Sequence, residues 1–340
     1  MPPLFIPRIS LVTPLPATTA TTATTSSSPS HLSMRFSNIV ASAALTVAAL
    51  ILSPTIQATP VPTPQALTPD AKAAADFVAL VKRGTSGFND WSCRPSTEHP
   101  NPLVLVHATM EVPLTNWIYM GPRFVTKGYC VFALTYGQNP KIPLLYGVNR
   151  MEKSAQELAV FVDKVLNATG ADKVDMLGHS QGSIMPRYWM KYLGGATKIR
   201  KFAGIGSVQY GSTLAGIVPL AKALGLFDPI KKIIDPLCEA CYQFALNSTF
   251  LNDLNEGGDT LPGIEYLLIA SKTDEMVTPY TMGFLRDNNP KVHNQVLQDW
   301  CGVDLQGHVS VAYDPIVWNG IHAFFTPSAD QTINCLDAFN

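Results

Sequence analysis

Charged residues are scarce in this sequence. Only 14% of the 340 residues are charged, and 24 basic side chains against 25 acidic ones leave a formal net charge of −1. The chain therefore has neither a basic field for nucleic acid nor an acidic tail. Nucleic acid is not expected as a partner, and nothing in the sequence indicates an obligate protein partner.

A stretch long enough to cross a membrane is also lacking near the amino terminus. The apolar run Ile39 to Leu52 has about 14 residues, whereas a transmembrane helix needs ~20. Arg35 precedes this run and the small residue Ala58 follows it, which is the pattern of a secretory signal peptide. We expect residues 34–58 to be a signal peptide and the protein to be secreted and extracellular. A membrane anchor is the alternative.

Acidic residues are absent from residues 1–33, a low-complexity leader rich in Thr, Ser and Ala. Because the signal begins only at Met34, the start of translation is expected there, and a transit-like leader is the alternative. Residues 59–83 read as a Pro-rich linker and a pro-segment that ends at the dibasic pair Lys82-Arg83. An ordinary helix that ends in solvated charges explains that pair equally well. Residues 84–340 are expected to form one catalytic domain, because α/β domains often exceed 200 residues.

Cysteine is limited to six residues, and an even number in a secreted chain favours disulfides. Many connectivities are open, and we take neighbours in order: Cys93 with Cys130, Cys238 with Cys241, and Cys301 with Cys335. The Cys238-x-x-Cys241 pair lacks the second ligand pair of a zinc site, so neither a metal nor a cofactor is expected. Asn167-Ala-Thr and Asn247-Ser-Thr are N-glycosylation sequons.

The segment Lys173 to Ser183 reads K-V-D-M-L-G-H-S-Q-G-S, and it is the most informative stretch of the chain. An apolar strand from Val174 to Leu177 leads into G-x-S-x-G, and a helix follows from about Ile184 to Leu193. Small residues on both sides of Ser180 allow a sharp turn between strand and helix that exposes the serine hydroxyl. Ser180 is therefore the predicted nucleophile.

Further apolar runs predict strands at 102–106, 129–135, 202–205 and 264–271, and Met151 to Leu166 predicts a helix closed by Gly170. This alternation indicates a mostly parallel sheet with helices on both faces. A serine nucleophile needs a histidine base and a carboxylate, in the chain order Ser, acid, His. We choose Asp274 over the adjacent Glu275, and His308 over His293 and His322, since His308 lies in a loop.

An oxyanion hole requires two backbone N–H groups, one after the nucleophile and one after the first strand. Gln181 and Thr109 are the expected donors, and the Thr109 hydroxyl is a further candidate donor. His107 is expected to orient this loop rather than to take part in the chemistry.

Five motifs resemble those of the secreted class 2 triacylglycerol lipases of fungi and actinobacteria, relatives of yeast lipase B. These motifs are Asn101-Pro-Leu-Val-Leu-Val, Gly128-Tyr-Cys-Val-Phe, Gly178-His-Ser-Gln-Gly, Asp274-Glu-Met-Val-Thr-Pro and Gly307-His. The resemblance covers about Gly87 to Phe325. It implies an α/β-hydrolase fold, Ser180, Asp274 and His308 as a triad, and Thr109 with Gln181 as oxyanion donors.

Two positions depart from that family pattern, because Ala108 and Ser183 stand where the family usually has Gly. If position 108 needed a positive φ, Ala would cost ~1 kcal/mol or displace the loop. A lost oxyanion donor lowers turnover roughly 10² to 10³-fold, so activity is expected to be low in that case.

The sequence thus predicts a serine esterase or lipase that cleaves acylglycerol esters, with a lipid–water interface as a second binding partner. A cutinase-like or polyester-cleaving esterase is the enzymatic alternative, and a binding protein on an inactive hydrolase scaffold is the alternative from another class. Residues 214–252 are too apolar for a plain loop. We expect a helical, lid-like insertion there, or else a subdomain packed permanently on the sheet.

Overall fold

The computed structural model describes residues 87–140, 145–214, 216–326, 328 and 332–336. The expected leader, signal peptide, and linker with pro-segment, residues 1–83, lie outside these described residues. Within them, no helix is long and apolar enough to cross a membrane.

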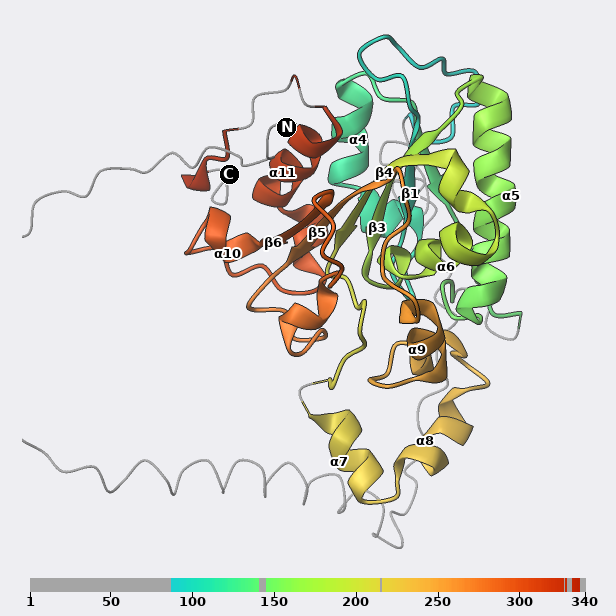
Figure 1. Ribbon diagram of the computed structural model, residues 1–340, viewed down its shortest axis with the longest axis vertical. Coiled ribbons are helices and arrows are strands. Elements are labelled where there is room, and N and C mark those ends of the chain that lie inside the picture. The colour runs from blue at the N-terminus through green and yellow to red at the C-terminus, as the bar shows by residue number, and fades with distance from the viewer. Residues whose placement is uncertain (1–86, 141–144, 215, 327, 329–331, 337–340) are drawn as a thin grey trace, which may run out of the picture. The chain divides into compact units, whose positions relative to one another are not determined.

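Six parallel strands form one sheet in the order β2-β1-β3-β4-β5-β6 (Figure 1). Their bounds are β1 Leu103–Val106, β2 Val131–Leu134, β3 Val174–His179, β4 Ile199–Ile205, β5 Glu265–Ala270 and β6 Val292–Val296. Five of the six coincide with the apolar runs of the sequence. Strands in a parallel sheet are covered on both faces, which is why these runs are continuously apolar rather than alternating.

Helices cover both faces of the sheet, as expected (Figure 1). Side chains of α5, α6 and α9 pack with Val104 and Val106 on one face. Side chains of α3, α4, α10 and α11 pack with Leu103 and Leu105 on the other. The bounds are α3 Pro113–Trp117, α4 Met120–Thr126, α5 Met151–Thr169, α6 Met185–Tyr192, α9 Thr249–Asn255, α10 Leu297–Trp300 and α11 Pro315–Phe325. Gly170 ends α5 in the left-handed conformation with φ 73°, as predicted.

Strand β6 was not among the strands expected from apolar runs. It spans Val292–Val296 and contains His293. It is the edge strand of the sheet, and none of its five residues is fully buried. A strand that is only half-covered needs no apolar run, so composition alone did not reveal it.

The expected insertion contains two helices of its own, α7 Ile217–Ala223 and α8 Phe227–Ile234. Both lie away from the sheet, beyond α9 (Figure 1). The chain on either side of them is fixed. Thr213 donates its hydroxyl to the Thr278 carbonyl at 2.9 Å, and the Asn139 amide donates to the carbonyls of Pro236 and Leu237 at 3.1 and 3.0 Å.

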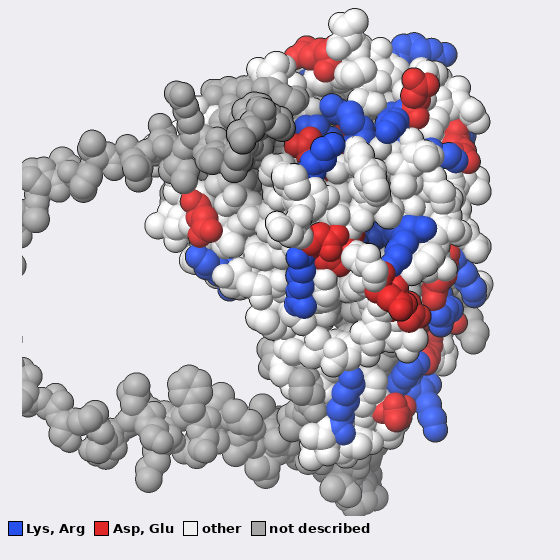
Figure 2. All heavy atoms as spheres, viewed as in Figure 1, with Lys and Arg blue, Asp and Glu red and all other residues white. Residues whose placement is uncertain are grey.

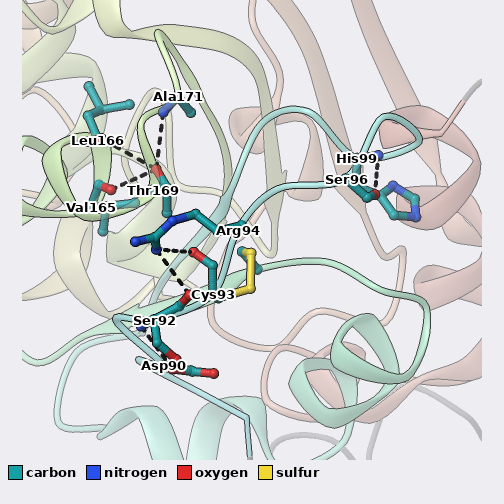
Figure 3. The surroundings of a disulfide bond; sticks show 11 residues. Asp90, Ser92, Cys93, Arg94, Ser96, His99, Val165, Leu166, Thr169 and Ala171 are labelled. Carbon is teal, nitrogen blue, oxygen red and sulfur yellow. Dashed lines mark hydrogen bonds between the residues drawn. A yellow bond between two sulfur atoms is a disulfide. The ribbon is translucent and has the colours of Figure 1, made fainter.

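Three disulfides join the cysteines in the expected pairs, Cys93–Cys130, Cys238–Cys241 and Cys301–Cys335. At the first of them, the Arg94 guanidinium donates to the carbonyls of Ser92 and Cys93, each at 3.0 Å (Figure 3). The Ser92 backbone N–H donates to the Asp90 carboxylate. On the face shown in Figure 2, acidic and basic side chains are interspersed, in agreement with the near-zero net charge.

Candidate active site

Ser180 lies at the turn between β3 and α6. It begins a short 3₁₀ turn, Ser180–Ser183, and has a φ of 53°. Both flanking glycines are required by close approach. A Cβ on Gly178 would lie 1.9 Å from the Gly182 carbonyl oxygen, and a Cβ on Gly182 would lie 2.1 Å from the Val106 carbonyl oxygen. The left-handed backbone at a serine is strained, and the packing of the turn maintains it.

His308 connects Ser180 to Asp274. Its Nε2 lies 2.8 Å from Ser180 Oγ, and its Nδ1 lies 2.9 Å from Asp274 Oδ2. The other carboxylate oxygen of Asp274 accepts from the backbone N–H groups of Met276 and Val277 at 2.9 and 2.7 Å. All three side chains are at least nine-tenths buried. This is the arrangement in which a histidine takes a proton from a serine while a carboxylate holds the imidazole.

The competing residues lie elsewhere or act differently. The Glu275 carboxylate accepts from the backbone N–H of His308 at 3.0 Å, so it holds the histidine loop rather than the imidazole. His293 faces Glu265 on the neighbouring strand β5 at 3.3 Å. His322 stacks on Trp318 with ring centroids 5.0 Å apart, and burial lowers its pKa to about 4.

The two expected oxyanion donors are backbone N–H groups without an acceptor in the described part of the chain. Within the described residues, neither the Thr109 nor the Gln181 backbone N–H donates a hydrogen bond, so both are free to bind an anionic oxygen. The Thr109 hydroxyl, in contrast, donates to Gln181 Oε1 at 2.5 Å. The expected third donor is therefore engaged with this side-chain amide instead.

The Ala108 substitution carries no backbone strain. Ala108 is not in the left-handed region, and Met110, two residues later, is, with φ 62°. The Ala108 N–H donates to Asn116 Oδ1 at 2.7 Å, which fixes the loop without glycine. The condition for the expected cost, a positive φ at position 108, is therefore not met, and the lost oxyanion donor that depended on it is no longer expected.

Ser183, the second departure, supports the turn. Its hydroxyl donates to the Ser180 carbonyl at 2.5 Å and accepts from the Ser207 hydroxyl at the same distance. Gln209 donates to the Ser183 carbonyl at 2.9 Å and in turn accepts from the buried Arg187 at 2.8 Å. A serine at this position therefore anchors the turn to the core.

Two positioning residues were not found by sequence reasoning. His179 Nε2 donates to the His308 carbonyl at 2.8 Å, which ties the nucleophile's turn to the histidine loop. Its Nδ1 lies 3.2 Å from the oxygen of Asn116, the residue that also holds Ala108. The G-H-S motif hinted at His179. No local pattern marks Asn116, because its contacts depend on the tertiary fold.

Burial keeps two histidines of this site neutral. It lowers the pKa of His179 to about 3, with further lowering from His308, and it lowers the pKa of His107 to about 4. His107 stacks on Tyr136, whose hydroxyl donates to the His107 carbonyl at 2.7 Å. The His107 ring thus packs against the core, and its backbone helps to hold the loop that leads to Thr109.

The predicted residues lie together at the carboxyl ends of the strands, because all parallel strands end on the same side of the sheet. Thr109 follows β1, Ser180 follows β3 and Asp274 follows β5. The chain reverses its direction of growth between β1 and β3, and such a switch point is where open α/β sheets bind ligands.

A family model for lipases of class 2 matches residues 100–317. The chain belongs to the class 2 lipase family. Six parallel strands with helices on both faces confirm the expected α/β-hydrolase fold. The matched range includes Thr109, Ser180, Gln181, Asp274 and His308.

Solved lipase structures share this fold. Aspergillus fumigatus lipase B has a TM-score of 0.51 and 19% identity over 66% of this chain and 54% of its own. Bacillus licheniformis lipase BlEst2 in its propeptide form has a TM-score of 0.50 and 18% identity over 69% of this chain and 52% of its own. The class 2 lipase chain thus spans about half the length of these two proteins, and identities this low show a common fold alone.

Proposed function

We propose that this class 2 lipase hydrolyses carboxylic esters of acylglycerols through Ser180, His308 and Asp274. The observation that supports this proposal is the pair of hydrogen bonds that links Ser180 Oγ to the His308 imidazole and the imidazole to Asp274. His308 Nε2 accepts the proton of Ser180 as Oγ bonds to the ester carbonyl carbon. The Thr109 and Gln181 N–H groups stabilise the resulting oxyanion. The protonated histidine then gives its proton to the leaving alcohol, and an acyl-enzyme remains.

Water completes the cycle by the same route in reverse. His308 takes a proton from the attacking water, the fatty acid leaves, and the proton returns to Ser180 Oγ. Asp274 stays ionised throughout and stabilises the imidazolium. The two N–H bonds at its second oxygen hold the carboxylate in place beside the imidazole.

Apolar side chains beside the site favour a lipid substrate. Met110 follows Thr109, Val309 follows His308 and Met276 follows Glu275, and they are 53%, 52% and 45% exposed. Three exposed apolar side chains, each within two residues of a proposed site residue, suit a contact with acyl chains or with a lipid–water interface. This observation favours acylglycerols over small polar esters. We also propose that the protein is related to yeast lipase B and to the secreted lipases of fungi and actinobacteria.

Replacing Ser180, His308 or Asp274 with Ala tests the assignment. Each variant should keep its fold and lose most of its turnover, on the order of 10⁴-fold or more, and double variants should be little worse because the three act as a unit. Emulsified triglyceride and a soluble short-chain ester are the substrates, and fluorophosphonate labelling of Ser180 reports the nucleophile directly. Asp299→Asn, an exposed acid on α10, is the matched control. A His308→Ala protein with normal rates would refute the triad.

We further propose secretion, with signal cleavage near Ala58 and a second cut after Arg83. Three disulfides support an oxidising compartment. Both sequon asparagines, Asn167 and Asn247, are exposed and suited to glycosylation. Amino-terminal sequencing of the secreted protein is the test. A mature end at Thr59 would remove the second cut, and one before Met34 would contradict the expected start.

A further inference from the structure

Two buried aspartates lie in the histidine loop, Cys301 to Asp314, one on either side of His308. The proposed chemistry uses neither. Asp304 lies four residues before His308 and is 3% exposed, and Asp314 lies six residues after it and is 1% exposed. Carboxylates are seldom buried this deeply unless they are paired. Their environment therefore calls for an explanation.

Each aspartate uses one oxygen to build the loop. Asp304 Oδ1 accepts from the backbone N–H of Gln306 at 3.0 Å, which shapes the turn before His308. Asp314 Oδ1 caps α11 by accepting from Ile316 and Val317 at 2.6 and 3.1 Å. The N-terminus of a helix also favours a negative charge at that position.

The second oxygens of the two residues have no donor. Asp304 Oδ2 and Asp314 Oδ2 are both fully buried, and no N–H or O–H group of another described residue donates to either oxygen. Asp304 acts on the Asp314 carboxyl both through its charge and through its side chain, so the two carboxyl groups are neighbours. Two ionised carboxylates would present only acceptors to each other, whereas one proton between them satisfies both oxygens.

No other charged group takes the place of that proton. Within the described residues no Lys or Arg forms a salt bridge with either aspartate, and the main causes that raise the Asp314 pKa include no positive charge. The titratable side chains on the surrounding elements are engaged elsewhere. These are Tyr313, which donates to the Thr115 carbonyl; Glu111, which accepts from the Thr115 hydroxyl; Asp299, which pairs with Lys272; His308 itself; and His322, which stacks on Trp318.

We propose that Asp304 and Asp314 share one proton and together act as a positioning pair that clamps the His308 loop. The pair joins the turn before His308 to the cap of α11 after it. The loop is thereby closed across its own ends, and the imidazole is held in line with Ser180. This role rests on the proposed function, because it matters for catalysis only if His308 is the base.

The shared proton gives the pair a signature in pH. Burial, and then the charge of Asp304, raises the pKa of Asp314 to about 7 from an ordinary value of 3.8. Between these two values the folded protein holds a proton that the unfolded chain has released. The contribution of the pair to stability is therefore full below about pH 4, falls as pH rises to about 7, and is constant above that.

Asp304→Asn is the decisive variant because it replaces the proton with a permanent donor. The asparagine keeps an oxygen for the Gln306 N–H and offers an N–H to Asp314 at every pH. Asp314→Asn keeps the cap oxygen for α11 and donates in the other direction, so it serves as the second variant. Asp299→Asn, an acid with a side chain 59% exposed, is the matched control.

We expect three results. Infrared spectra of the wild type at pH 6 should show the carbonyl stretch of a buried carboxylic acid, which disappears above about pH 7 and is missing from both Asn variants. The melting temperature of Asp304→Asn should gain roughly 2–6 °C on the wild type between pH 4 and pH 8, whereas that of Asp299→Asn should follow the wild type. The ratio of kcat for Asp304→Asn to that for wild type on a soluble ester should rise several-fold from pH 6 to pH 8.5, with KM unchanged.

Spectra that do not differ between wild type and the Asn variants would overturn the proposal, and so would melting curves that run parallel across this pH range. A melting temperature that rises with Ca²⁺ and falls with EDTA would place a cation between the carboxylates and would also overturn it. The infrared and melting measurements need no turnover. A failure of the ester-hydrolase proposal would appear separately, as Ser180→Ala activity equal to wild type.

Discussion

Gly182 lies where no side chain fits, because the atoms that a Cβ would contact belong to the backbone and cannot move aside without displacing the chain. An added Cβ would lie 2.1 Å from the Val106 carbonyl oxygen and 2.7 Å from that of His107, both backbone atoms of the chain leading to Thr109. A larger residue must therefore push the nucleophile's turn away from the oxyanion loop. Precise placement of the two N–H donors is what stabilises the developing charge.

Gly182→Ala should lower kcat by at least about 10²-fold, since one displaced oxyanion donor costs that much, and should destabilise the fold by roughly 1–3 kcal/mol. Gly302→Ala is the control, because its nearest heavy atom would be 3.8 Å from the new Cβ. Rates on a soluble ester and urea unfolding measure the two effects. Normal turnover by Gly182→Ala would contradict the close approach of turn and loop.

The residues that could be predicted from the sequence are those whose chemistry depends on local spacing. Ser180 is marked by glycines at two fixed offsets, and Asp274 and His308 follow in the expected order on loops after later strands. Asn116 could not be predicted, because it acts by touching Ala108 and His179, which are 8 and 63 residues away. The pairing of Asp304 with Asp314 is hidden for the same reason, since only the folded loop brings them together.

At the scale of elements, buried strands and long helices were predictable and half-exposed ones were not. The helix α5 shows a clear one-face pattern over Met151–Thr169, and its side chains fill the core beside β1 and β2. The edge strand β6 instead reads V-H-N-Q-V, and half-exposure allows this polar composition. Where packing does not dictate the residue type, the sequence carries little signal for the element.

Helices α7 and α8 and the turn between them expose apolar side chains. Leu224, Leu226 and Ile230 are 63%, 49% and 42% exposed. Permanent packing on the sheet would have buried them, so their exposure favours a wall or lid that meets acyl chains. Each methylene that such a surface buries contributes ~0.8 kcal/mol to binding.

Activity should accordingly rise from acetate esters to longer acyl groups. Leu224→Asp and Ile230→Asp should depress the hydrolysis of long-chain esters several-fold more than that of acetate, because charge on this surface opposes contact with an acyl chain. Val160→Asp, which changes an apolar side chain 72% exposed on α5, is the control and should leave both rates unchanged. Equal losses on long and short esters would mean that the insertion is structural, and a preference for acetate would favour a small-ester esterase.

At the scale of the whole molecule, the three disulfides differ chiefly in how much chain they close. Cys93–Cys130 and Cys301–Cys335 span 37 and 34 residues, and Cys238–Cys241 spans 3. In the chain-entropy account a cross-link restricts the unfolded ensemble more when its loop is longer. The first two should therefore contribute most to the free energy of unfolding, and the third should mainly shape the chain after α8.

Replacing both cysteines of one pair with Ala tests this ordering. Loss of either long-range pair should lower the free energy of unfolding by roughly 4 kcal/mol, and loss of Cys238–Cys241 by roughly 2 kcal/mol. Chemical unfolding under non-reducing conditions measures each difference, with the wild-type protein treated in parallel. Mass spectrometry after alkylation without reduction should find no modified cysteine. Alkylated Cys238 and Cys241 would reopen a metal-binding role for that pair, and equal losses from all three pairs would show that native-state contacts, rather than loop length, set the contribution of each disulfide.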